Sequence, residues 1–189
     1  MQTKSESRPL APALEEVSTA LWLTGRIAFW VQLALVFGCG IPLLLAVSGT
    51  NFSQGSNPGI GIGIFWAVCG ILVLCFSAYL AFRYGRFGKK LRNPDSKLRP
   101  KKADTIQLLR LGAIVGLVGI LINLLGAGAT LGVLVAKAVS QPPWVAITNP
   151  NTIIRALDVF VALANVNGIA AHFVGTVGAL WLLERVHRH

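Results

Sequence analysis

LGAIVGLVGILINLLGAGATLGVLVAK, residues 111–137, runs as far as Lys137 without a single Asp, Glu, Lys or Arg. A helix needs about 20 predominantly apolar residues to cross the hydrocarbon core of a bilayer. Residues 111–137 are therefore predicted to form one membrane-spanning helix, and the rest of the chain can be compared with this stretch.

Two further stretches lack those charged residues, 27–82 and 159–183. The first is long enough for two spans and is interrupted at 48–59 by Gly, Ser, Asn and Pro, which favour turns. The sequence thus predicts an all-α integral membrane bundle of four transmembrane helices, with no room for a separate soluble domain. The predicted spans are about 26–47, 60–82, 111–137 and 157–183.

The composition of the whole chain agrees with this class. Of its 189 residues, 54% are hydrophobic and 13% are charged, and the mean hydropathy is +0.66. A soluble domain carries about 25% charged residues, and a disordered chain combines low hydrophobicity with high charge. Both classes are excluded. The net charge of +10 does not indicate a nucleic-acid partner, because few aromatic residues alternate with the basic ones.

Most of the positive charge lies in one segment, 83–110, between the second and third predicted spans. Basic short loops stay on the cytoplasmic side of a membrane, so we expect this basic inner loop and both termini on the cytoplasmic or stromal side. The basic residues set the topology, and an alternative role is binding to anionic lipid headgroups. They are Arg83, Arg86, Lys89, Lys90, Arg92, Lys97, Arg99, Lys101, Lys102 and Arg110.

Short tails flank the predicted membrane domain of 26–183. In residues 1–25 apolar side chains recur at helical spacing from Leu10 to Leu21, which indicates either a short amphipathic helix at the membrane interface or a plain polar tail. The same residues lack the features of a signal peptide or a plastid transit peptide. Residues 184–189 form a C-terminal tail that carries Arg185 and Arg188.

Polar residues recur every seven positions in the third and fourth spans. Seven residues are nearly two helical turns, so each set shares one face. In antiparallel neighbours the levels would match: Lys137 with Asp158, then Thr130 with Asn165, then Asn123 with His172. Two interpretations stand, an interhelical hydrogen-bond network or a polar path for an ion or proton. We call this set the polar column: Asn123, Thr130, Lys137, Asp158, Asn165 and His172.

The sequence contains no recognisable catalytic motif, and we expect no enzyme and no bound cofactor. Cys39, Cys69 and Cys75 lie within the first two spans, where buried cysteines are commonly packing residues. A soft-metal site is the alternative, and the metal ligands are unknown. Six glycines in the third span would permit close helix packing.

Long ordered motifs in the second half of the chain resemble a known family. They are AGATLGVLVAKA at 127–138, ALDVF at 156–160, and Asn165 followed by HFVG at 172–175. This pattern resembles the cyanobacterial and plastid family of four-helix membrane proteins that includes the chloroplast inner-envelope Tic permease. The likeness runs from about Arg26 to Leu183. It implies either iron transport or a part in protein translocation, with no agreed transport residues to carry over.

We therefore expect a small permease-like protein that moves iron or another metal ion, with iron as cargo rather than cofactor. The alternative is a non-transporting component of a protein translocon, or an assembly factor or subunit of a larger membrane complex. The expected partners are the lipid bilayer and either further copies of this chain or a larger complex. The expected location is a cyanobacterial plasma or thylakoid membrane in preference to the plastid inner envelope.

Overall fold

A computed structural model describes residues 12–50, 58–140 and 154–188 of the chain. These residues form long α-helices and one short 3₁₀ turn, η1, and no strand occurs among them. The described residues include four helices long and apolar enough to cross a membrane, which confirms the predicted fold class. The elements are α1 (Pro12–Thr50), α2 (Pro58–Leu91), η1 (Ser96–Leu98), α3 (Lys102–Val139) and α4 (Ala156–Arg188).

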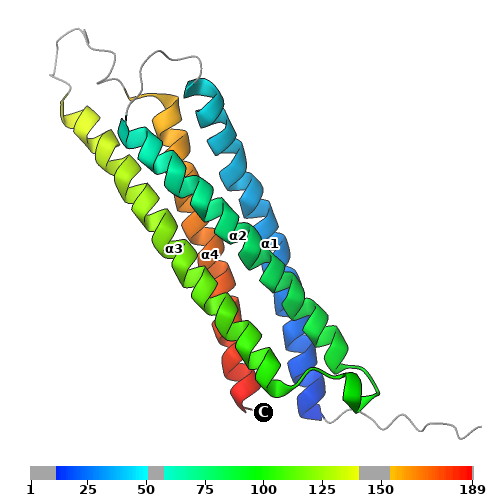
Figure 1. Cartoon of the computed structure of the whole chain (residues 1–189). Coiled ribbons are helices and arrows are strands. Elements are labelled where there is room, and N and C mark those ends of the chain that lie inside the picture. Colours follow the sequence, from blue (N-terminus) through cyan, green and yellow to red (C-terminus); the bar gives the residue numbers. More distant parts are fainter. Residues whose placement is uncertain (1–11, 51–57, 141–153, 189) are drawn as a thin grey trace, which may run out of the picture.

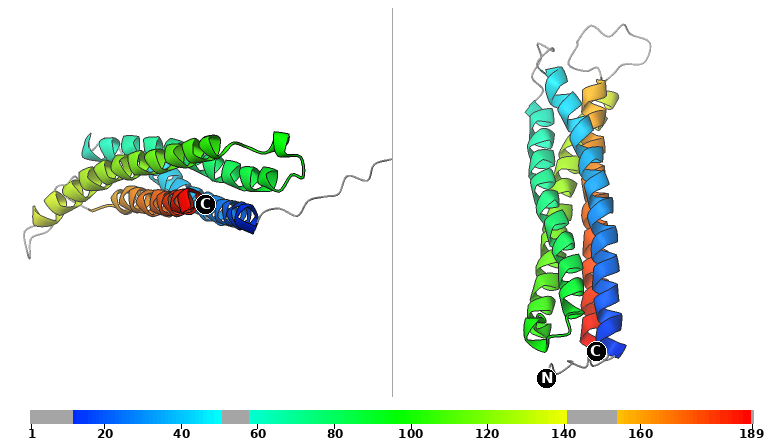
Figure 2. Two further views of the ribbon diagram at one scale, coloured as in Figure 1. Left: turned by 90° about the horizontal axis from the view of Figure 1, so that it is seen from below. Right: turned by 90° about the vertical axis from the view of Figure 1, so that its right-hand side faces the viewer.

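The four helices form an up-and-down bundle (Figures 1 and 2). Each helix packs against its two neighbours in the order α1, α2, α3, α4, and α2 also reaches α4 across the centre. The start of α1, the end of α4 and the connection from α2 to α3 lie at one end of the bundle (Figure 2). We call this the basic end, and the other the opposite end.

Buried positions recur every seven residues on all four helices. A repeat of 3.5 residues per turn is typical of left-handed bundles with interlocking side chains. Many of these buried residues are small or polar, so the helix axes can approach closely at the centre. The buried heptad positions are Ser18, Gly25, Gln32, Cys39 and Ala46 on α1; Gly63, Gly70, Ser77, Tyr84 and Leu91 on α2; Leu109, Gly116, Asn123, Thr130 and Lys137 on α3; and Asp158, Asn165, His172, Ala179 and Val186 on α4.

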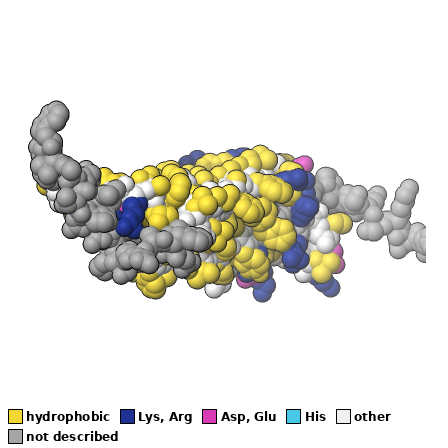
Figure 3. All heavy atoms as spheres, turned by 90° about the horizontal axis from the view of Figure 1, so that it is seen from above, with side chains coloured by type: hydrophobic (Ala, Val, Ile, Leu, Met, Phe, Trp, Pro, Cys, Tyr) yellow, Lys and Arg dark blue, Asp and Glu magenta, His cyan; other side chains and the backbone are white. Residues whose placement is uncertain are grey.

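The outside of the bundle is apolar, in contrast to its centre. Side chains such as Phe37, Leu44 and Leu72 are more than half exposed. Figure 3 shows hydrophobic side chains along the length of the bundle, with many of the charged ones gathered at the basic end. A bilayer would cover this surface, since exposed apolar area of this extent is not stable in water.

Two sequence predictions need correction. Residues 12–25 do not form a separate interfacial helix or a tail, because α1 is continuous from Pro12 and buries Val17 and Leu21 in the bundle. The segment 83–110 is mostly helical, and only 92–101 connects α2 to α3. Residues 1–11 of the predicted tail, and most of the predicted break at 48–59, lie outside the described residues.

The short connection is pinned to α1 by hydrogen bonds. The Arg92 guanidinium donates to the hydroxyl groups of Ser18 (3.1 Å) and Thr19 (2.9 Å), and the Ser18 hydroxyl donates to the Gly88 carbonyl (2.7 Å). A carboxylate oxygen of Asp95 accepts the backbone N–H of Lys97 and starts the 3₁₀ turn. The basic end is therefore an ordered structure.

Candidate functional site

The six residues of the polar column are all buried. Lys137 is 5% exposed and the other five are 1% exposed or less. They project from α3 and α4 toward each other and toward α2. Because polar groups in a membrane interior need partners, the partners of each level define what the column can do.

At the opposite end, Lys137 and Asp158 form an ion pair with Nζ and Oδ2 2.5 Å apart. The same Oδ2 accepts the backbone N–H of Arg155 at 3.1 Å, which is one half of a capping box. Lys137 is in the last turn of α3 and Asp158 in the first turn of α4, so each charge also has the sign that its helix dipole favours. The pairing that the spacing predicts is present.

The next level holds Thr130 and Asn165. Both side chains are described, yet no hydrogen bond joins them. The Thr130 hydroxyl donates to the Gly126 carbonyl of its own helix at 2.7 Å. The Asn165 amide donates to the Val161 carbonyl (2.9 Å) and across to the Gly63 carbonyl of α2 (3.3 Å). The partner across the bundle is backbone on α2, not the side chain that the spacing suggested.

The third level repeats this arrangement. Asn123 donates to the Gly119 carbonyl at 2.9 Å, and His172 Nε2 lies 3.3 Å from the Gly70 carbonyl of α2. No hydrogen bond joins these two described side chains. Since a carbonyl only accepts, Nε2 carries a proton, and in the neutral imidazole Nδ1 is then an acceptor.

The polar line continues toward the basic end through residues that the sequence reasoning missed. Thr176 donates its hydroxyl hydrogen to the His172 carbonyl at 2.8 Å. Gln32 of α1 donates to the Ser77 hydroxyl of α2 (2.8 Å) and lies within 3.4 Å of the Ala171 carbonyl. Ser77 could have been found from the sequence, because Gly63, Gly70, Ser77 and Tyr84 form a heptad series on α2.

Glycines form the sockets that hold these polar side chains. A Cβ at Gly119 would overlap the His172 ring, one at Gly126 would overlap the Asn165 amide, and one at Gly63 would overlap the Thr130 hydroxyl. In contrast, a Cβ at Gly128 or Gly132 would meet open space. Close packing therefore explains α3 glycines such as Gly119 and Gly126, and it does not explain Gly128 and Gly132.

Several acceptor atoms of this line have no hydrogen-bond partner among the described residues. Leaving a buried polar atom unsatisfied costs about 1–3 kcal/mol, so such atoms in a row call for a ligand, a water molecule or a proton. They are Gln32 Oε1, Asp158 Oδ1, Asn165 Oδ1 and His172 Nδ1. Consecutive α4 members are seven residues apart, or about 10 Å along the helix.

The described residues contain no group of three or more His, Cys, Asp or Glu side chains placed to hold a metal ion. Cys39 is buried against Leu74 and Ala171 in a small apolar cluster. Within one copy of the described chain, the column therefore offers a cation single carboxylate, amide and imidazole ligands in succession, not one compact centre.

The basic residues predicted to set the topology surround the basic end. Arg83 stacks on Phe87 and Arg86 on Phe82, with the guanidinium carbon 5.6 and 6.0 Å from the ring centroids. Arg99 donates to the Asn93 carbonyl at 2.8 Å. Those that the structure leaves exposed are Arg86, Lys89, Lys90, Arg92, Lys97, Lys101, Lys102 and Arg110.

The fold and the column define a polytopic four-helix membrane protein with a polar interior. A family model described as "Protein of unknown function (DUF3611)" matches residues 11–187, and the chain belongs to that family. The chain is also similar to "Protein TIC 21, chloroplastic" of Arabidopsis thaliana, with 31% identity over 188 residues. The match covers 97% of this chain and 62% of that protein. No solved structure matches the chain significantly.

Proposed function

We propose that this chain is a permease-like membrane protein that moves a small cation along the polar column, with iron as the cargo. The observation that carries the proposal is the row of buried acceptors without a hydrogen-bond partner among the described residues, at Asp158, Asn165, His172 and Gln32. Oxygen and imidazole nitrogen acceptors in succession would replace the hydration shell of a cation step by step. Interhelical adhesion alone does not require a second, unused acceptor at each level.

The order of the groups supports a direction of approach. A cation arriving at the opposite end first meets the Asp158 carboxylate, whose Oδ1 is unpartnered while Oδ2 binds Lys137. It would then compete with the Lys137 ammonium for the carboxylate. Asn165 and His172 follow along α4. Polar side chains occupy the sockets at the glycines and fill the space between the helices. A cation can therefore pass only if α4 moves away from α2 and α3.

Iron fits this donor set better than an alkali cation does. Carboxylate and imidazole are both ligands of ferrous iron, and the column supplies one of each with amide oxygen between them. Weak successive binding favours movement over retention. The family resemblance of the sequence motifs, which implies iron transport as one of two roles, gives further support.

Uptake into liposomes tests the proposal. The purified chain is reconstituted, ferrous iron is added outside with a chelating fluorophore inside, and uptake is compared with empty liposomes. We expect faster uptake by the wild type, and most of it lost in Asp158→Asn and His172→Ala variants whose helix content is unchanged. Uptake at the rate of empty liposomes would refute the permease role. Uptake that both variants retain would refute the route.

A second function is favoured by tight packing in the bundle next to the polar column. The enclosed gap between Gln32, Ser77 and Tyr84 admits no water molecule, and a component that only adheres to other membrane proteins needs nothing more open. We propose as the alternative a non-transporting part of a translocon or of a larger membrane complex. A chain that shows no uptake and purifies from its native membrane in a stable large complex would establish this alternative.

A further inference from the structure

A groove of about 450 Å³ opens on the outside of the bundle, near the basic end, between α1 and α2. Its floor is a close crossing of the two helices at Gly25 and Gly85. A Cβ on Gly25 would lie 2.5 Å from the Gly85 nitrogen and 2.8 Å from the Ala81 carbonyl oxygen. With glycine at the crossing and large side chains around it, the two helices leave a hollow that faces the surrounding membrane.

The lining of the groove is divided along its length. Trp22 and Arg26 come from α1, and Arg86 and Lys89 come from α2, all toward the basic end. Because α1 and α2 are antiparallel, Trp30 and Phe82 line the groove one to two turns deeper toward the middle of the bundle. Both are about half exposed. The groove is thus cationic at the membrane interface and aromatic on the hydrocarbon side.

No acid among the described residues neutralises the three cations of the groove. No Asp or Glu is among the described residues that line it, and none of Arg26, Arg86 and Lys89 forms an ion pair with another described residue. Two of them are held over the walls by stacking, with the Arg26 guanidinium carbon 5.5 Å from the Trp22 ring and that of Arg86 6.0 Å from Phe82. The stacking positions their N–H groups, which donate no hydrogen bond to another described residue.

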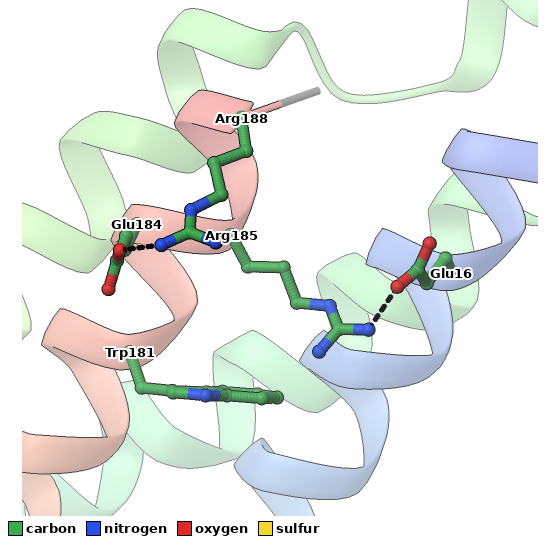
Figure 4. Close-up of a pocket in the computed structure, with 5 residues that line it drawn as sticks. All are labelled: Glu16, Trp181, Glu184, Arg185 and Arg188. Atoms are coloured by element: carbon green, nitrogen blue, oxygen red, sulfur yellow. Dashed lines mark hydrogen bonds and ion pairs between the residues drawn. The ribbon is translucent and has the colours of Figure 1, made fainter.

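The pocket on the other side of α1 is built differently. It lies between α1 and α4, where Arg185 stacks on Trp181 and pairs with Glu16, and Arg188 pairs with Glu184 (Figure 4). There each stacked or exposed guanidinium has a carboxylate from the same chain. In that pocket the stacked Arg185 has an acidic partner, whereas no acid is among the described residues that line the α1–α2 groove.

We infer that the groove binds an anionic phospholipid, with the phosphate between Arg26, Arg86 and Lys89 and an acyl chain along Phe82 and Trp30. Arg binds phosphate oxygens with paired N–H groups, and basic clusters next to a membrane span attract anionic lipids. Aromatic side chains are favoured at the same depth. An anionic phospholipid has a negatively charged headgroup followed by apolar acyl chains. The groove has basic residues followed by aromatic ones in the same order. The inference does not depend on transport by the polar column.

Retention of lipid by the full chain tests the inference. The protein in mild detergent is mixed with equal amounts of phosphatidylglycerol and phosphatidylcholine of the same acyl composition, and bound lipid is counted by native mass spectrometry. We expect phosphatidylglycerol to be retained. Its affinity should fall about fivefold for each cation removed in Arg26→Gln and Arg86→Gln variants. Arg83→Gln is the matched control, because Arg83 is on the same helix, stacks on Phe87 and does not line the groove.

Equal retention of the two lipids, or an equal loss in Arg83→Gln and Arg86→Gln, would overturn the assignment. So would a dimer that forms through the groove and disappears in the Arg26→Gln, Arg86→Gln double variant. A measurement on the unaltered chain avoids any folding defect of the variants. Brominated phosphatidylglycerol should quench tryptophan fluorescence at lower mole fraction than brominated phosphatidylcholine, and identical quenching curves would contradict the inference.

Discussion

Asn in place of Asp158 is expected to destabilise the bundle more than the loss of any neutral side chain of the polar column. The substitution keeps the size of the side chain and removes its charge. Lys137 is then left 5% exposed with no counter-charge, and breaking a buried ion pair by removing one partner costs about 3–5 kcal/mol. The favourable interaction of the carboxylate with the first turn of α4 is lost as well, about 0.3–1 kcal/mol.

A double-mutant cycle separates this effect from general damage. When both partners become apolar, as in Lys137→Met with Asp158→Leu, no uncompensated charge remains, and such replacements are often neutral. We expect the double variant to recover at least about 2 kcal/mol relative to the sum of the single variants, within the range of couplings between residues in contact. The free energy of unfolding is measured by far-ultraviolet circular dichroism in mixed micelles.

Additive single and double variants would refute the ion pair as a stabilising unit. A cost below about 1 kcal/mol for Asp158→Asn, the value typical of an exposed pair, would refute its burial. A simple charge exchange is a weaker test, because Asp at position 137 and Lys at position 158 would each oppose the helix dipole next to them.

Three further predictions follow from the same contacts. Gly119→Ala should lower stability, because its Cβ would overlap the His172 ring. The Cβ of Gly128→Ala meets open space, so this variant should be neutral or gain up to about 1 kcal/mol from helix propensity. Thermal unfolding compares the two variants directly. Gln32→Leu removes an unpartnered acceptor and, with it, the amide's hydrogen bond to Ser77. Because these two effects oppose each other, stability should change by less than about 1 kcal/mol, and a larger loss would refute this offset. A reporter fused after Arg188 that is active only outside the cytoplasm should be silent if the basic end faces inward, and activity there would reverse the topology.

The contact between α3 and α4 could be predicted because its residues are charged or polar in an apolar background. The heptad spacing predicts the pairing of Lys137 with Asp158, because it assigns each residue to a face of its helix and to a depth along the bundle. The actual partners of Asn165 and His172 could not be predicted. Glycines at 63 and 70 expose backbone carbonyls of α2 to these side chains, and a missing side chain leaves no chemical signal of an acceptor in the sequence.

The ends of the helices were predicted less well than their middles. Charged residues mark where a helix leaves the hydrocarbon, not where it ends, so α2 continues to Leu91 and α1 begins at Pro12. The groove between α1 and α2 could not be seen for a related reason. It depends on the crossing at Gly25 and Gly85, which are far apart in the sequence and resemble the other glycines.

Ferrous iron uptake by a pair of asparagine variants tests the proposed route most directly. Asn165 belongs to the polar column and donates to the Gly63 carbonyl, while Asn167 is off the column and donates to the Gly38 carbonyl at 3.2 Å. Each Ala substitution therefore removes one interhelical hydrogen bond from α4. We predict that Asn165→Ala loses most of the uptake into liposomes and that Asn167→Ala keeps it. Equal uptake by the two variants, or none by the wild type, would contradict the account.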